Sequence, residues 1–176
     1  MAKSLESLEK GNVFRVEIDK IPSRNLRTMF QFNRRIGRLK DTVAVILLVH
    51  LYAEYWLSRL LEKRGKSTKT ISDMKFKKKL DEVKKLGLLS DDKLWTNLKL
   101  LNDVRNKYAH QWEYNFLADY RSKQNTTRFY DKTGQDIREK LLKGGADDMQ
   151  ILLGIKRVTA TWLSEHCFAV HKIIGN

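Results

Sequence analysis

A fifteen-residue apolar run, VAVILLVHLYAEYWL from Val43 to Leu57, most constrains how this chain can fold. It is shorter than the roughly 20 apolar residues that a transmembrane helix needs, and His50 and Glu54 interrupt it. A helix that is apolar on most sides is typical of the buried helix of a bundle. We therefore predict that this segment is the central helix of a helical bundle and that it does not cross a membrane.

The helix-stop and helix-start residues divide the chain into helical segments. Pro22 is its single proline, and it stands just ahead of the first periodic segment, where a proline costs a helix little. Caps and apolar spacing predict an all-α, antiparallel helical bundle of about five main helices. These cover residues 24–39, 42–63 after the cap Asp41, 72 or 73 to just before Gly87, a helix starting at 90–92, and 147–174, with 65–72 as a loop.

Residues 113–145 differ from the rest because they are polar and rich in tyrosine, asparagine and threonine. We expect an inserted excursion before the last helix, with short strand character at 126–130 and a short helix in GQDIREKLLKGG. The sequence has no internal repeat, so residues 1–176 are predicted to form a single domain with this insertion.

The net charge of +14 indicates a polyanionic partner, because a polyanion relieves the self-repulsion of such a chain. Nucleic acid is the first candidate. An acidic protein is the second, and an anionic membrane surface is the third, since no helix pairs a clean basic face with a strongly apolar one.

The single cysteine, Cys167, excludes an internal disulfide framework and is typical of a reducing compartment. The first residues, MAKSLESLEKGN, lack the apolar segment of a signal peptide. These two features predict a cytoplasmic protein.

The segment LNDVRNKYAH, residues 101–110, carries the polar side chains that an ordinary core helix does not need. On a helix of about 100° per residue, Arg105 falls within an apolar stripe formed by Leu94, Leu98, Leu101, Val104, Tyr108 and Trp112. Asn102, Asn106 and His110 are spaced four apart and share the neighbouring face.

A purely structural interpretation accounts for part of this pattern. Arg105 can pair with Glu54, the one carboxylate inside the apolar run, because a guanidinium cannot be buried without an anion. Asn106 can orient His110, and His110 can cap the end of its helix. This interpretation predicts a Glu54–Arg105 ion pair, but it gives no reason for the asparagine–histidine row.

The segment FKKKLDEVKKLGLLSDDKLWTNLKLLNDVRNKYAH, residues 76–110, resembles the HEPN superfamily of all-α domains. Members carry an arginine, a polar residue and a histidine in the pattern R-x(4–6)-H, which Arg105, Asn106 and His110 match. The elements F-x-x-K-L, LGLL and HLYAEYWLSRLLE are similar to HEPN-like families related to the mannitol operon repressor. The resemblance covers roughly residues 41–112.

The resemblance implies metal-independent cleavage of single-stranded RNA at a homodimer interface, in a toxin or an anti-phage defence effector. Arg105, Asn106 and His110 would be catalytic, supported by Glu54, Tyr108 and Asn102, with no cofactor. An antitoxin would be a natural acidic partner. The alternative that the resemblance leaves open is a non-catalytic binding or regulatory module, as in the mannitol operon repressor group.

The remaining candidate sites have simpler explanations. The lysines Lys75, Lys78, Lys79 and Lys107 can contact RNA phosphates, or they can belong to an ordinary solvated face. His50 is predicted to be a satisfied core histidine. Cys167 and His171 share a helical face but lack the further ligands of a zinc site, so no metal site is predicted.

Overall fold

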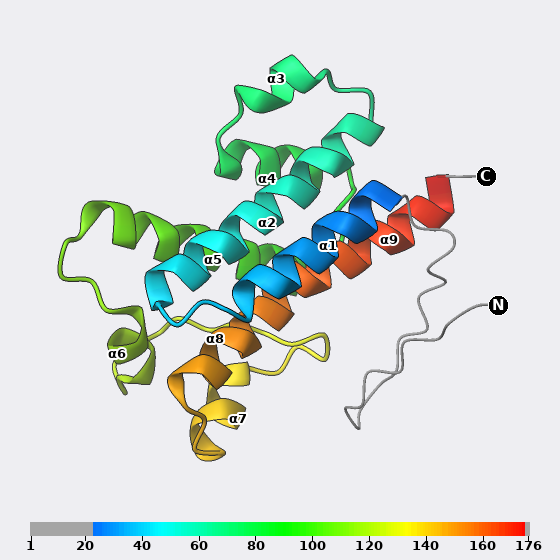
Figure 1. The fold of residues 1–176 in the computed structure, drawn as a ribbon. Helices are drawn as coiled ribbons and strands as arrows, with labels where there is room; N and C mark the ends of the chain where they lie inside the picture. Colours follow the sequence, from blue (N-terminus) through cyan, green and yellow to red (C-terminus); the bar gives the residue numbers. More distant parts are fainter. Residues whose placement is uncertain (1–22, 175–176) are drawn as a thin grey trace.

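The computed structural model describes residues 23–174, and within that range the chain is an all-α helical bundle built around α2 (Thr42–Lys63) (Figure 1). The predicted fold class is confirmed. Asp41 caps α2 as expected, with its side chain accepting a hydrogen bond from the amide of Ala44 at 2.7 Å. Packed against α2 are α1 (Ser23–Ile36), α4 (Phe76–Lys85), α5 (Asp92–His110) and α9 (Trp162–Ile174).

Helix α2 is the one described helix with the length and apolar composition to cross a membrane, a test that the core helix of a soluble protein also passes. In the bundle it is a core helix. Its buried residues are Val45, Ile46, Val49, His50, Tyr52, Ala53, Trp56, Leu57, Leu60 and Leu61. The predicted central position of the apolar run is therefore confirmed.

Helix α1 ends at Ile36, three residues before the predicted end. It lies along α2 through a stack of Phe32 on Tyr52, whose ring centroids are 3.9 Å apart. The hydroxyl of Tyr55 adds a hydrogen bond of 2.9 Å to the side-chain oxygen of Asn25. These contacts with α2, rather than the helix propensity of its residues, determine the position of α1.

The prediction of one loop over residues 65–72 followed by a helix from Ser72 or Asp73 is wrong. A short helix, α3 (Thr68–Ser72), forms first, because the side chain of Ser67 caps it by accepting from the amide of Thr70 at 3.1 Å. Ile71 and Met74 are buried and hold the turn that follows, so α4 begins only at Phe76.

Helix α5 begins as its start signal predicts. Asp91 is the N-cap, and its side chain accepts from the amides of Lys93 and Leu94 at 2.9 and 3.0 Å. Leu94, Leu98, Leu101 and Val104 are buried, which confirms the first two-thirds of the predicted apolar stripe.

Residues 113–145 form two short helices, α6 (Phe116–Arg121) and α7 (Ile137–Lys143). The expected strand character is reduced to one isolated antiparallel bridge between Tyr130 and Asp136. The segment is also less peripheral than its polar composition suggests, since Phe116, Tyr120 and Phe129 are among the largest fully buried side chains. The insertion therefore contributes to the core.

The side chain of Asn97, fully buried in α5, holds this insertion in place. It donates to the carbonyls of Tyr130 (2.7 Å) and Val158 (2.8 Å) and accepts from the amide of Tyr130 (2.8 Å). One amide thus joins α5, the insertion and the C-terminal helical segment.

The C-terminal segment is not one regular helix, although the expected range 147–174 is helical. It consists of α8 (Asp148–Lys156), a π-helical turn η2 (Arg157–Thr161) and α9. Asp147 and Gln150 form a capping box at its start. The hydroxyl of Thr159 bonds back to the carbonyl of Ile155 at 2.7 Å inside the π turn.

We predict that Asn97→Ala destabilises the protein by about 3 kcal/mol or more, because it leaves several buried backbone groups without partners at about 1–3 kcal/mol each. Urea denaturation measures the loss, and limited proteolysis should then cut within residues 113–145. The control is Thr96→Ala, which removes a hydroxyl bonded only within its own helix and should change stability by less than about 1 kcal/mol. Equal stability of the two variants would contradict this role for Asn97.

Candidate functional site

The residues of the R-x(4–6)-H motif lie on the C-terminal half of α5. Arg105 and Asn106 are partly buried, whereas His110 is exposed and is the last residue of the helix. The next residue, Gln111, closes the helix with a backbone hydrogen bond to the carbonyl of Lys107 at 2.8 Å. The motif therefore runs from the edge of the core to solvent.

Arg105 does not pair with Glu54, so that prediction is wrong. One guanidinium nitrogen of Arg105 donates to the side-chain oxygen of Asn106 at 3.2 Å. Among residues 23–174, no carboxylate lies within 4.0 Å of the Arg105 guanidinium. Within the described part of the chain, Arg105 therefore keeps N–H donors that no carboxylate occupies.

Glu54 pairs instead with Lys79 of α4, whose ammonium lies 2.7 Å from the carboxylate. Lys79 is only 6% exposed, because it stands on the same buried face of α4 as Phe76 and Leu80. The prediction that Lys79 contacts RNA is therefore wrong. Its ammonium group forms an ion pair inside the protein instead.

His50 is 5% exposed, which confirms the prediction of a core histidine, and it also contacts the motif helix. Its Nε2 lies 3.3 Å from the side-chain oxygen of Asn102, and its ring packs 4.2 Å from that of Phe76. Burial lowers the pKa of His50, while the contacts with Asn102 and Glu54 oppose this shift and the nearby charge of Arg105 adds to it.

A polar cluster thus lies between α2, α4 and α5. It is made of the paired contacts His50–Asn102 and Glu54–Lys79, with Arg105 at its edge. The sequence predicts Arg105 as a catalytic residue and Glu54 and Asn102 as residues that support it, but it pairs Glu54 with Arg105 instead of Lys79. The sequence does not predict that His50 belongs to this polar cluster. Its spacing of four residues from Glu54, which puts both on one face of α2, could have indicated it.

Tyr108, which lies inside the motif, connects the end of α5 to α6. Its hydroxyl accepts a hydrogen bond from the amide of Phe116 at 3.3 Å, and its ring meets that of Tyr114 edge-on at 5.0 Å. Trp112 does not continue the apolar stripe, because α5 ends before it, and it is 96% exposed.

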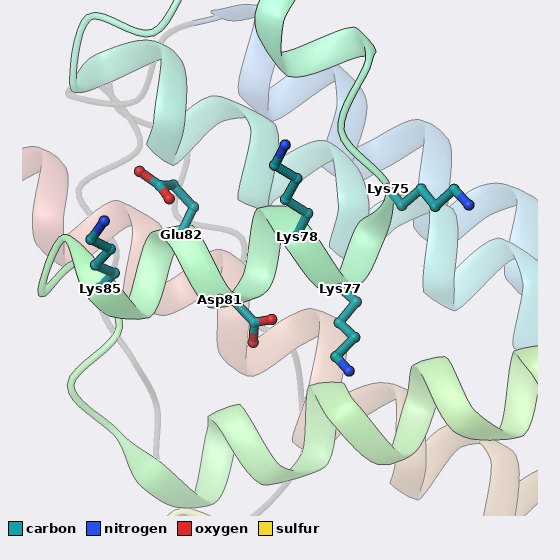
Figure 2. A pocket seen from close by; sticks show the side chains of 6 residues that line it. All are labelled: Lys75, Lys77, Lys78, Asp81, Glu82 and Lys85. Atoms are coloured by element: carbon teal, nitrogen blue, oxygen red, sulfur yellow. The ribbon is translucent and has the colours of Figure 1, made fainter.

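Four lysines form the exposed face of α4 and its N-cap: Lys75, Lys77, Lys78 and Lys85 (Figure 2). With Asp81 and Glu82 they border a shallow depression of about 370 Å³. Figure 2 shows these side chains spreading from one helix rather than converging on a point. The arrangement suits an extended polyanion better than a small ligand.

A second hollow, of about 780 Å³, lies at the C-terminal end of α5, where the chain leaves the helix after His110. Residues 111–115 line it together with Lys107 and Asp119. Lys107 is only partly available for phosphate, since its ammonium lies 3.5 Å from Asp119 and over the ring of Tyr114. Sequence reasoning missed this hollow, although two aromatic residues directly after the motif were a usable signal.

The other candidate groups are not assembled into a site. Cys167 is fully buried and free, and burial raises the pKa of its thiol, which makes it a poor nucleophile. The side chain of His171 lies outside the described residues. Within residues 23–174, no group of three or more His, Cys, Asp or Glu side chains could hold a metal ion.

Comparison of the chain with protein-family models, with curated proteins and with solved structures finds no match. The functional interpretation therefore rests on the residues and their geometry.

We predict opposite consequences for two neighbouring lysines of α4. Lys79→Met should destabilise the protein by about 1–3 kcal/mol, because it leaves the carboxylate of Glu54, which is 27% exposed, without its partner. Lys78→Met removes an exposed charge and should cost less than about 0.5 kcal/mol.

RNA binding should depend on Lys78 and not on Lys79, which is the reverse of their expected effects on stability. Lys78→Met should lower the slope of log affinity against log salt for single-stranded RNA by about 0.7 per lost phosphate contact, whereas the folded Lys79→Met protein should keep the wild-type slope. Urea denaturation and salt titrations of a labelled oligonucleotide measure the two effects. A shallower slope for Lys79→Met alone would contradict the assignment.

We predict that His50 makes the protein less stable in acid. The folded-state pKa of His50 lies below its ordinary value of 6.5, so the unfolded chain binds more protons and stability falls as pH drops below about 6.5. His50→Gln keeps a polar partner for Asn102 but cannot titrate there. Urea denaturation between pH 7.5 and 5 should give a flatter profile for the variant, and parallel profiles would argue against a shifted His50.

Proposed function

We propose that this protein is a metal-independent endoribonuclease of HEPN type that cuts single-stranded RNA. The observation that carries the proposal is the state of Arg105. It is a partly exposed guanidinium with no carboxylate within 4.0 Å among the described residues, and it lies five residues before an exposed histidine on the same helix. Such a pair combines a fixed anion-binding charge with an imidazole, a side chain that can serve as a general base or a general acid.

The chemistry needs no group beyond the substrate and these side chains. The ribose 2′-oxygen attacks the adjacent phosphorus, the P–O5′ bond breaks, and a 2′,3′-cyclic phosphate and a 5′-hydroxyl result. A base takes the proton of the 2′-hydroxyl and an acid gives a proton to the leaving 5′-oxygen, both roles that histidine can fill. Arg105 stabilises the charge on the phosphoryl oxygens.

Asn106 acts on Arg105 rather than on His110 in this proposal. Its side-chain oxygen accepts the guanidinium hydrogen bond at 3.2 Å, which limits the rotamers of Arg105 and leaves its other N–H groups for phosphate. No hydrogen bond joins Asn106 to His110 among the described residues. Asn106 is therefore a positioning residue.

The geometry of α5 favours a site made by two copies of the chain. Arg105 and His110 are about 140° apart around the helix and about 7.5 Å apart along it, so they diverge from one another. One histidine also cannot be base and acid in the same step. A two-fold dimer through the face of Asn106 and His110 supplies a second set of both residues.

We predict that the wild-type protein cleaves single-stranded RNA in EDTA, leaves DNA intact and produces 2′,3′-cyclic phosphate ends. His110→Ala should lower the rate by about 10²- to 10⁴-fold with little change in stability, since His110 is exposed at a helix end. Product mapping and thermal denaturation measure the two. His166→Gln is the matched control, because His166 contacts the carbonyl of Leu88, remote in sequence from the motif, and it should keep full activity.

Two results would overturn the nuclease proposal. One is undiminished cleavage by purified His110→Ala, and the other is activity that disappears on chelation and returns with magnesium. A monomer by light scattering at micromolar concentration in the presence of RNA would remove the two-copy site. RNA binding without cleavage would favour the alternative, a non-catalytic binding or regulatory module.

A further inference from the structure

The hollow at the end of α5 is lined in part by Trp112, the most exposed large apolar side chain of the described chain. Trp112 follows the end of α5 by two residues and lines the hollow there. The hollow's volume of about 780 Å³ lies within the range of about 300–1,000 Å³ that is usual for ligand sites. An aromatic face so open to solvent is suited to stacking.

Two other residues that line the hollow, Tyr114 and Asn115, are held by contacts with their neighbours. The ring of Tyr114 packs edge-on against that of Tyr108 at 5.0 Å, and its hydroxyl donates to Asp119 at 3.2 Å. Asn115 is fixed as the N-cap of α6, accepting from the amide of Ala118 at 3.0 Å. The hollow therefore combines a solvent-exposed aromatic ring with side chains that are already fixed in place.

The charges in the hollow do not suit a phosphate. It contains two carboxylates, Glu113 and Asp119, and one ammonium, Lys107, which is already 3.5 Å from Asp119. Among the described residues, no cation lies within 4.0 Å of Glu113. Carboxylates in this position repel phosphate but accept hydrogen bonds from amino groups, as they do from N4 of cytosine.

We propose that this hollow binds one unpaired nucleobase of the RNA beside the scissile phosphate, stacked on Trp112, and that Glu113 makes it prefer a base with an exocyclic amino group, cytosine over uracil. This inference rests on the proposed function, because it takes single-stranded RNA to be the ligand. The exposed lysines of α4 and the net charge of +14 then serve the backbone, while the hollow serves the base.

The test measures binding with probes that cannot be cut. Three labelled 2′-O-methyl tetranucleotides of cytidine, of uridine and of abasic residues are titrated against the full chain by fluorescence anisotropy. They lack a free 2′-hydroxyl, so cleavage cannot affect the result. The variants are Trp112→Ala, Trp112→Phe and Glu113→Ala, with Glu139→Ala as the control for loss of an exposed carboxylate.

Stacking on Trp112 predicts that Trp112→Ala weakens binding of the cytidine probe by about five- to 150-fold and leaves the abasic probe unchanged, while Trp112→Phe keeps most of the affinity. The wild type should prefer cytidine over uridine by at least about fivefold. Glu113→Ala should remove that preference, and Glu139→Ala should keep it.

The outcomes that overturn the inference are equal losses for the abasic and cytidine probes in Trp112→Ala, or no preference between cytidine and uridine. Protection of Trp112 from acrylamide quenching on concentrating the protein alone would identify the hollow as a contact between copies, and would also overturn it. Base-dependent binding without cleavage of ordinary RNA would remove the nuclease proposal alone. RNA cleavage by Trp112→Ala with the same kcat and KM as the wild type would contradict the base site and leave the nuclease proposal standing.

Discussion

The ion pair between Lys79 and Glu54 decides what Arg105 can do. A carboxylate inside the apolar central helix needs a cation, because an unpaired charge there is costly. Lys79 of α4 and Arg105 of α5 are the two candidates. The lysine of α4 takes this position at 2.7 Å. Arg105 is then left at the edge of the same polar cluster with Asn106 as its hydrogen-bond partner, and in the proposed function its charge binds the RNA phosphate.

Helix α5 connects stability to the candidate site. At its middle, the buried amide of Asn97 binds the insertion and the π turn before α9. At its end, Tyr108 accepts from the amide of Phe116 and so fixes the start of α6. The end of α5, the residues that follow it and part of α6 line the hollow. The insertion is therefore part of the proposed site and not a separate appendage.

Charge is distributed unevenly over the surface in a way that suits nucleic acid. The outer face of α4 carries lysines that spread along one helix (Figure 2), which is favourable for a phosphate backbone. The hollow at the end of α5 carries aromatic rings and carboxylates, which are favourable for a base and unfavourable for a phosphate. Backbone and base would thus contact different elements, as they do in most single-strand recognition.

The sequence alone determined the central position of α2, the caps at Asp41 and Asp91, and the buried leucine stripe of α5, because caps and helical periodicity act over a few neighbouring residues. It also identified Arg105, Asn106 and His110 as candidate catalytic residues. Only the tertiary structure decided the partner of Glu54, the contact between His50 and Asn102, and the burial of Lys79. Each depends on which helices pack together, and several polar residues on neighbouring faces could have satisfied the same charge. The end of α5 at His110, which turns Trp112 from a core position into an exposed one, likewise follows from how the insertion packs against the bundle.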